Sequence, residues 1–221
     1  MKKKYYIFEM DMWWLQIVSA ILLILLLFFT YYIYPEFTIL DNSFAIAFIF
    51  MIPYMILHEL LHSIAYVLNG AKFKNITYGM HLEKGILCCL CKQNISKKNI
   101  LNSLLSPFII IGVLTYIIGI FINNQLLIII SIFNLSGCAG DLIMFIALSK
   151  LKNFEFSEYD NPLAFGLYSN EDLSKIELKG LKYIDCSTKL DKKDRKKIKV
   201  SKYSVYISFG YLLLGLLLYR L

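Results

Sequence analysis

Five apolar stretches, each long enough to cross the hydrocarbon layer of a bilayer, dominate this chain of 221 residues. A membrane-spanning helix needs about 20 predominantly apolar residues, because a helix rises about 1.5 Å per residue through a layer about 30 Å thick. The stretches cover residues 12–34, 43–68, 100–122, 125–149 and 203–219. They predict an all-α polytopic membrane protein with about five transmembrane helices.

The basic residues predict how these helices are oriented. If the N-terminus lies in the cytoplasm and the chain crosses at every stretch, 22 of the 23 Lys and Arg residues fall on the cytoplasmic side. Lys and Arg are enriched in cytoplasmic loops of membrane proteins. The prediction is therefore a multi-pass protein of the cell membrane with a cytoplasmic N-terminus. The basic run 192–199 is expected to contact anionic lipid headgroups, and nucleic acid is not expected as a partner.

Two polar regions lie between the stretches on the predicted cytoplasmic side. Residues 75–94 carry β-favouring segments on either side of Glu83-Lys84-Gly85, which predicts a small β-hairpin. Residues 150–202 form a small cytoplasmic segment with one candidate strand at 163–169. The predicted organisation is a membrane core (1–149), this cytoplasmic segment, and a C-terminal transmembrane helix (203–221).

Ionisable side chains are rare inside the stretches, and three of the four form one motif. His58, Glu59 and His62 spell H-E-x-x-H in the second stretch, and Asp141 lies in the fourth. Ionisable groups at membrane depth are costly and usually functional. Two His four residues apart share one face of a helix and can bind one zinc ion, while the Glu between them can act as general base.

A catalytic zinc site needs a third protein ligand, and depth in the membrane nominates Asp141. His58 and Asp141 lie at similar distances from the cytoplasmic ends of two helices that run in the same direction. Gly137 and Gly140 are expected to let these helices approach closely. Asn134, two turns before Asp141, is a candidate for binding substrate backbone or the site itself. A proline in each of the second and third stretches, Pro53 and Pro107, is expected to kink its helix and open a path for water.

The motif HELLH, the following hairpin, a proline-containing third helix and the late segment SGCAGD resemble the putative zincin peptidase family. These are small bacterial membrane proteins related to the site-2 proteases, which cut within membranes. The resemblance covers residues 43–149 and implies one Zn²⁺ held by His58, His62 and Asp141, with Glu59 as general base. It departs from the site-2 proteases where Gly140 precedes the aspartate, because those enzymes carry Asp-Gly in that position.

The hypothesis is an intramembrane zinc metalloprotease that hydrolyses peptide bonds of membrane-protein or peptide substrates. An extended substrate segment is expected to pair with the edge of the hairpin. Two alternatives stay open: a non-catalytic metal-binding scaffold or immunity-type membrane protein, and a metal transporter. A closed structural zinc site usually has four protein ligands, and a transporter needs ligands spread along a path. The sequence leaves the substrate and the oligomeric state undetermined.

Overall fold

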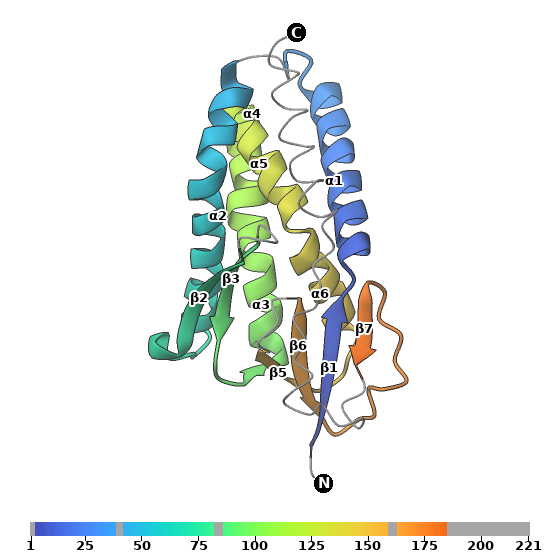
Figure 1. Cartoon of the computed structure of the whole chain (residues 1–221). Coiled ribbons are helices and arrows are strands. Elements are labelled where there is room, and N and C mark those ends of the chain that lie inside the picture. Colours follow the sequence, from blue (N-terminus) through green and yellow to red (C-terminus); the bar gives the residue numbers. More distant parts are fainter. Residues whose placement is uncertain (1–2, 39–41, 82–85, 159–162, 185–221) are drawn as a thin grey trace.

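The computed structural model describes residues 3–38, 42–81, 86–158 and 163–184. Long helices form one part of the molecule, and strands gather at one end of them (Figure 1). The first strand and the last strands lie side by side at that end, although most of the chain separates them in the sequence (Figure 1).

Three helices are long and apolar enough to cross a membrane, and a bent pair of helices could form a fourth span. They are α1 (Met12–Ile33), α2 (Asn42–Leu68) and a continuous helix made of α3 (Lys97–Pro107), the π-helical η3 (Phe108–Leu114) and α4 (Thr115–Phe121). The bent pair is α5 (Gln125–Gly137) with α6 (Ala139–Ser149), whose axes differ by 46°.

The prediction of about five transmembrane helices is therefore wrong for the described part of the chain. The stretch 125–149 is broken near Cys138, which hydropathy alone does not reveal. The predicted span at 203–219 lies outside the described residues.

The prediction of an all-α fold is also wrong, because the structure contains a five-stranded antiparallel sheet of order β4-β5-β6-β1-β7. Its strands are β1 (Lys4–Met10), β4 (Ile95–Ser96), β5 (Glu155–Glu158), β6 (Ala164–Ser169) and β7 (Leu181–Ile184). The strand predicted at 163–169 is thus present as β6, where it pairs with both β1 and β5. The N-terminal residues and the segment after α6 build one sheet together.

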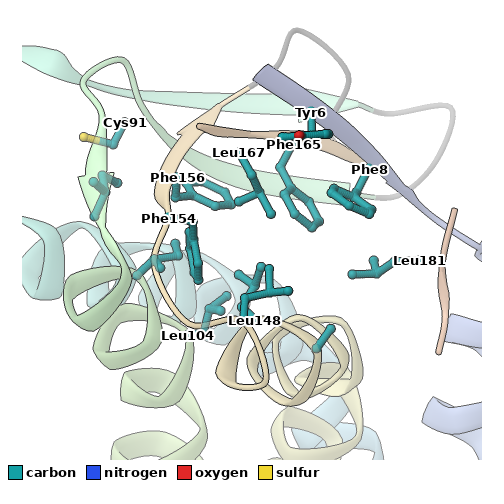
Figure 2. Packing of buried hydrophobic residues seen from close by; sticks show 14 of the residues in the cluster. Tyr6, Phe8, Cys91, Leu104, Leu148, Phe154, Phe156, Phe165, Leu167 and Leu181 are labelled. Atoms are coloured by element: carbon teal, nitrogen blue, oxygen red, sulfur yellow. The ribbon is translucent and has the colours of Figure 1, made fainter. Parts of the chain in front are cut away.

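The sheet packs on the ends of the helices through a continuous apolar core. Phe8, Phe165 and Leu167 project from the sheet toward helix ends that carry Leu104 and Leu148 (Figure 2). All five side chains are buried. Since each such side chain contributes about 1.5–3 kcal/mol when it leaves water, the sheet is held firmly to the helical part.

The two predicted hairpin strands are confirmed, since β2 (Ile76–His81) pairs antiparallel to β3 (Ile86–Cys91) after the short 3₁₀ helix η1 (Phe73–Asn75). The turn predicted at 83–85 lies outside the described residues. Two contacts attach it to α2. The Tyr78 hydroxyl donates a hydrogen bond to Ser63 Oγ over 2.7 Å, and the backbone of Cys89 is hydrogen-bonded to the Glu59 carboxylate.

Close helix packing depends on glycines other than those predicted. A Cβ at Gly112 would lie 2.4 Å from Leu135 Cδ2, and one at Gly119 would lie 2.9 Å from Ile128. Among the described residues, a Cβ at Gly137 would meet nothing within 4 Å, and one at Gly140 would make only ordinary contacts. The expectation that Gly137 and Gly140 allow the helix carrying Asp141 to approach α2 is therefore wrong, and η3 and α4 approach α5 closely instead.

Candidate metal centre

The helix α2 brings two imidazoles together. His58 and His62 are separated by about one helical turn, so their side chains project from the same face. Their Nε2 atoms lie 3.1 Å apart, and their rings meet nearly edge to face at 71°. His62 is buried and His58 is half-buried. One point in space is therefore within reach of both Nε2 atoms.

The break between α5 and α6 supplies a carboxylate at the same point. Asp141 lies in the first turn of α6, just beyond the bend at Cys138. Its Oδ2 atom lies 3.1 Å from His58 Nε2 and 3.5 Å from His62 Nε2. Among the described residues, these three side chains form the group of His, Cys, Asp and Glu that could hold a metal ion.

The hydrogen bonds made by Nδ1 of each histidine determine its tautomer. The tautomer in turn determines whether Nε2, which faces Asp141, carries a lone pair. His58 Nδ1 lies 3.0 Å from Asn134 Oδ1, and His62 Nδ1 lies 3.0 Å from the backbone oxygen of Ser103. Carbonyl oxygens only accept, so each Nδ1 carries the hydrogen and each neutral ring keeps a lone pair on Nε2. The orientation of the Asn134 amide is consistent with this assignment, because its Nδ2 faces Pro107 O and Cys138 Sγ.

The three atoms fit a zinc ion in both chemistry and spacing. Two lone pairs and a carboxylate oxygen within 3.1–3.5 Å repel one another unless a cation or a shared proton lies among them. Ligand atoms about 2.0–2.1 Å from a tetrahedral zinc are roughly 3.3 Å from one another, which matches these separations. Two neutral His and one carboxylate leave the fourth tetrahedral position without a protein ligand from this group, as in catalytic zinc sites.

Comparison with known families leads to the same chemistry. Residues 50–154 match the family model described as "Putative zincin peptidase". This region of the chain is similar to the putative zincin peptidase family. Neither the curated proteins nor the solved structures gave a match. The matched region runs from within α2 to the residue before β5, and it contains every residue of the centre described above.

Glu59 lies beside this centre without belonging to the three-residue group. It is half-buried, and its carboxylate is hydrogen-bonded to the backbone of Cys89 in β3. Together with His58, His62 and Asp141 it lines one cavity of about 540 Å³. A carboxylate in this position can exchange a proton with water or substrate in the cavity without serving as a ligand.

The cavity is mainly apolar and extends away from the polar centre. Its lining includes four methionines, one from β1, two from α2 and one from α6: Met10, Met51, Met55 and Met144. Residues 88–90 of β3 and residues 163–165 at the start of β6 form further parts of the wall. Methionine adapts its shape easily, so such a wall suits large apolar side chains of varied form.

Sequence reasoning missed the roles of three residues that surround the predicted ligands. Ser103 accepts from His62, Cys138 Sγ lies 3.9 Å from His58 Nδ1, and Pro107 accepts from Asn134. None carries a metal-binding motif, although Pro107 was already notable as a proline within a helix. Asn134 stays a predicted substrate-binding residue, but in this structure its amide is bonded within the protein.

Proposed function

We propose that this protein is a zinc metallopeptidase of the membrane that hydrolyses peptide bonds in apolar, membrane-associated segments. The observation that carries the proposal is the convergence of two His Nε2 atoms and one carboxylate oxygen within 3.1–3.5 Å, with Glu59 in the same cavity. A zinc ion at such a site supplies Lewis-acid chemistry, acidifying water and polarising a peptide carbonyl.

The three ligand residues and Glu59 have separate roles in the proposed reaction. His58, His62 and Asp141 hold the ion, and their outer hydrogen bonds keep the two rings in the required tautomer. Glu59 takes a proton from the attacking water and gives it to the amine of the departing peptide, so it acts first as base and then as acid. The hydrogen bond from the Cys89 backbone holds this carboxylate in place against the hairpin.

The cavity suggests the class of substrate. Its methionine-rich wall suits an apolar peptide, and it runs between helices of membrane length. The strand β3 lines the cavity next to Glu59, so an extended substrate segment would lie along this strand. A membrane helix has no accessible amide until it unwinds, because its backbone groups bond to one another. We therefore propose that substrates are unwound before cleavage.

The proposed placement is a multi-pass protein of the cell membrane with its N-terminus in the cytoplasm. The helices of membrane length support the membrane assignment, and the distribution of Lys and Arg supports the orientation. A reporter enzyme joined after residue 42 should then be active only on the outer side of the membrane. A cytoplasmic readout would overturn the orientation.

The decisive test of the reaction is the substitution Glu59→Gln in matched membranes. The amide keeps the shape of the side chain but cannot accept a proton, and loss of such a base lowers the rate by about 10²–10⁴-fold. Zinc content should stay near that of the wild type, because Glu59 is not in the ligand group. The matched control is Glu171→Gln, which changes an exposed carboxylate and should alter neither property.

Cleavage is followed on a panel of single-span test proteins that differ in their transmembrane segments. Cleavage by the wild type and its loss in Glu59→Gln, with zinc retained, would support the peptidase. Undiminished cleavage by Glu59→Gln, or a wild-type protein that binds zinc but cleaves no member of the panel, would count against it. The second result would favour a metal-binding scaffold.

A further inference from the structure

Pro107 lies in a helix at a place where its missing N–H has a direct effect on the proposed zinc site. In an α-helix the N–H of residue i donates to the carbonyl four residues earlier. Proline has no N–H, so it leaves that carbonyl without its helical partner. For Pro107 the residue four positions earlier is Ser103, and both residues are buried.

The released carbonyl is the one that binds His62. Ser103 O lies 3.0 Å from His62 Nδ1 and also accepts a hydrogen bond of 2.9 Å from Ser106 Oγ. The next backbone donor does not compete for it, because Phe108 N–H donates to Leu105 O. Both lone pairs of Ser103 O therefore serve side chains.

A second hydrogen-bond chain leads from the same proline to the other histidine. The carbonyl of Pro107 accepts from Asn134 Nδ2 over 3.3 Å, and Asn134 Oδ1 lies 3.0 Å from His58 Nδ1. The helix changes to π-helical geometry directly after Pro107, at Phe108. Short π-helical segments within α-helices are frequent at functional sites.

We infer that Pro107 is a positioning residue of the zinc site, because by withholding an N–H it leaves Ser103 O free to hold His62 in the Nδ1–H tautomer. The Nε2 lone pair of His62 then faces His58 and Asp141. This inference rests on the zinc site proposed above. It gives Pro107 a role different from the predicted one, which was to kink the helix and admit water.

The test is Pro107→Ala, which restores an N–H that competes for Ser103 O. The two effects of the change have opposite signs. The metal-free protein should be as stable as the wild type or more stable, since the helix gains a hydrogen bond and loses a proline. Zinc affinity should fall by about 10–100-fold, the usual cost of losing a hydrogen bond to a ligand histidine.

The matched control is Pro53→Ala, the same change at an exposed proline inside α2. It should leave zinc affinity within about threefold of the wild type, because none of the hydrogen bonds described for the two histidines involves Pro53. Zinc affinity is measured by competition with a chelator, and stability by thermal unfolding of the metal-free protein in detergent. Equal zinc affinity in Pro107→Ala and the wild type would overturn the inference while leaving the zinc site intact.

A second readout gives a result for the wild type alone, and that result does not depend on whether the variant folds. Nitrogen-15 NMR of the metal-free protein at a pH where His62 is neutral reports which ring nitrogen carries the hydrogen. The Nδ1–H form is expected in the wild type, and an increased share of the Nε2–H form in Pro107→Ala. A wild-type His62 in the Nε2–H form would refute the role given to Pro107. A wild type that binds no zinc would instead refute the proposed function.

Discussion

Replacing Asn134 by alanine tests whether the hydrogen bond to Nδ1 of His58 increases zinc affinity. Asn134 Oδ1 lies 3.0 Å from His58 Nδ1, at normal hydrogen-bond length. Alanine removes this acceptor and leaves a half-buried N–H with a poorer partner, since Cys138 Sγ is 3.9 Å away. The ring of His58 then gains freedom to rotate and to carry its hydrogen on Nε2, where the metal would bind.

Two free-energy estimates for Asn134→Ala, one for an unpaired donor and one for weaker metal binding, are similar in size. Leaving a buried donor unpaired costs about 1–3 kcal/mol. Losing an outer hydrogen bond of a ligand histidine lowers metal affinity by about 10–100-fold, which equals about 1.4–2.7 kcal/mol. We therefore expect Asn134→Ala to bind zinc about 10–100-fold more weakly than the wild type, in a chelator competition in detergent.

Two comparison variants make the assay specific. Asn134→Asp keeps an acceptor for His58 but loses the donor to Pro107, so its zinc affinity should lie above that of Asn134→Ala. Asn102→Ala removes an exposed amide in α3 and should have no effect. If Asn134→Ala folds and binds zinc as tightly as the wild type, the argument that this hydrogen bond orients His58 is wrong.

Two further changes test packing and capping. Gly112→Ala places a Cβ 2.4 Å from the buried Leu135 side chain and should destabilise the protein by about 1–3 kcal/mol in thermal unfolding. Gly137→Ala, which meets no described residue within 4 Å, should not, and equal melting points for the two variants would refute the packing. Asp11→Ala removes the N-cap of α1 and should lower the free energy of unfolding by about 0.5–2 kcal/mol. The hydrogen bond from Lys182 holds the pKa of Asp11 below its ordinary value, so its stabilising effect should be constant above about pH 5 and shrink as the pH falls below about 4; a difference between wild type and variant that grows on acidification would contradict this.

The helices were predictable because hydrophobic runs of membrane length leave few alternatives. The predicted stretch 12–34 differs from α1 by one residue, and the predicted stretch 43–68 differs from α2 by one residue. The proximity of Asp141 to the two histidines followed from helical spacing and depth alone, and the structure places them 3.1–3.5 Å apart. The spacing of residues within α2 and within α6 is therefore a strong constraint, although the stretch 125–149 as a whole is bent.

The sheet was not predictable by the same reasoning. In β1, Tyr6, Ile7 and Phe8 are all buried, so the alternation that normally marks a half-buried strand is missing. The partners of β1 lie more than 150 residues later, and the sequence near β1 does not indicate which strands it pairs with. The strand β4 has only two residues and is too short for any pattern.

The outer hydrogen bonds of the site were also hidden in the sequence. They depend on Ser103 and Pro107 contributing backbone oxygens, and backbone atoms are the same in every residue. The proline was visible, but only the fold shows which carbonyl it leaves unpaired and which side chain lies opposite. The break at Cys138 was not indicated by the sequence either, because its flanking residues are small and apolar.

The sheet that joins β4, β1 and β6 restricts how the chain can thread the bilayer, because hydrogen-bonded strands must lie on one side of it. Between β1 and β4 come α1 and α2, and between β4 and β5 come the α3–α4 helix and the bent pair α5–α6. Each interval must therefore contain an even number of crossings. If α3–α4 crosses, then α5–α6 crosses too, and its 46° bend marks a broken span and not a re-entrant loop. The hairpin lies between α2 and β4, so parity places it on the same side as the sheet, and a substrate segment lying along β3 would have to be drawn toward that side.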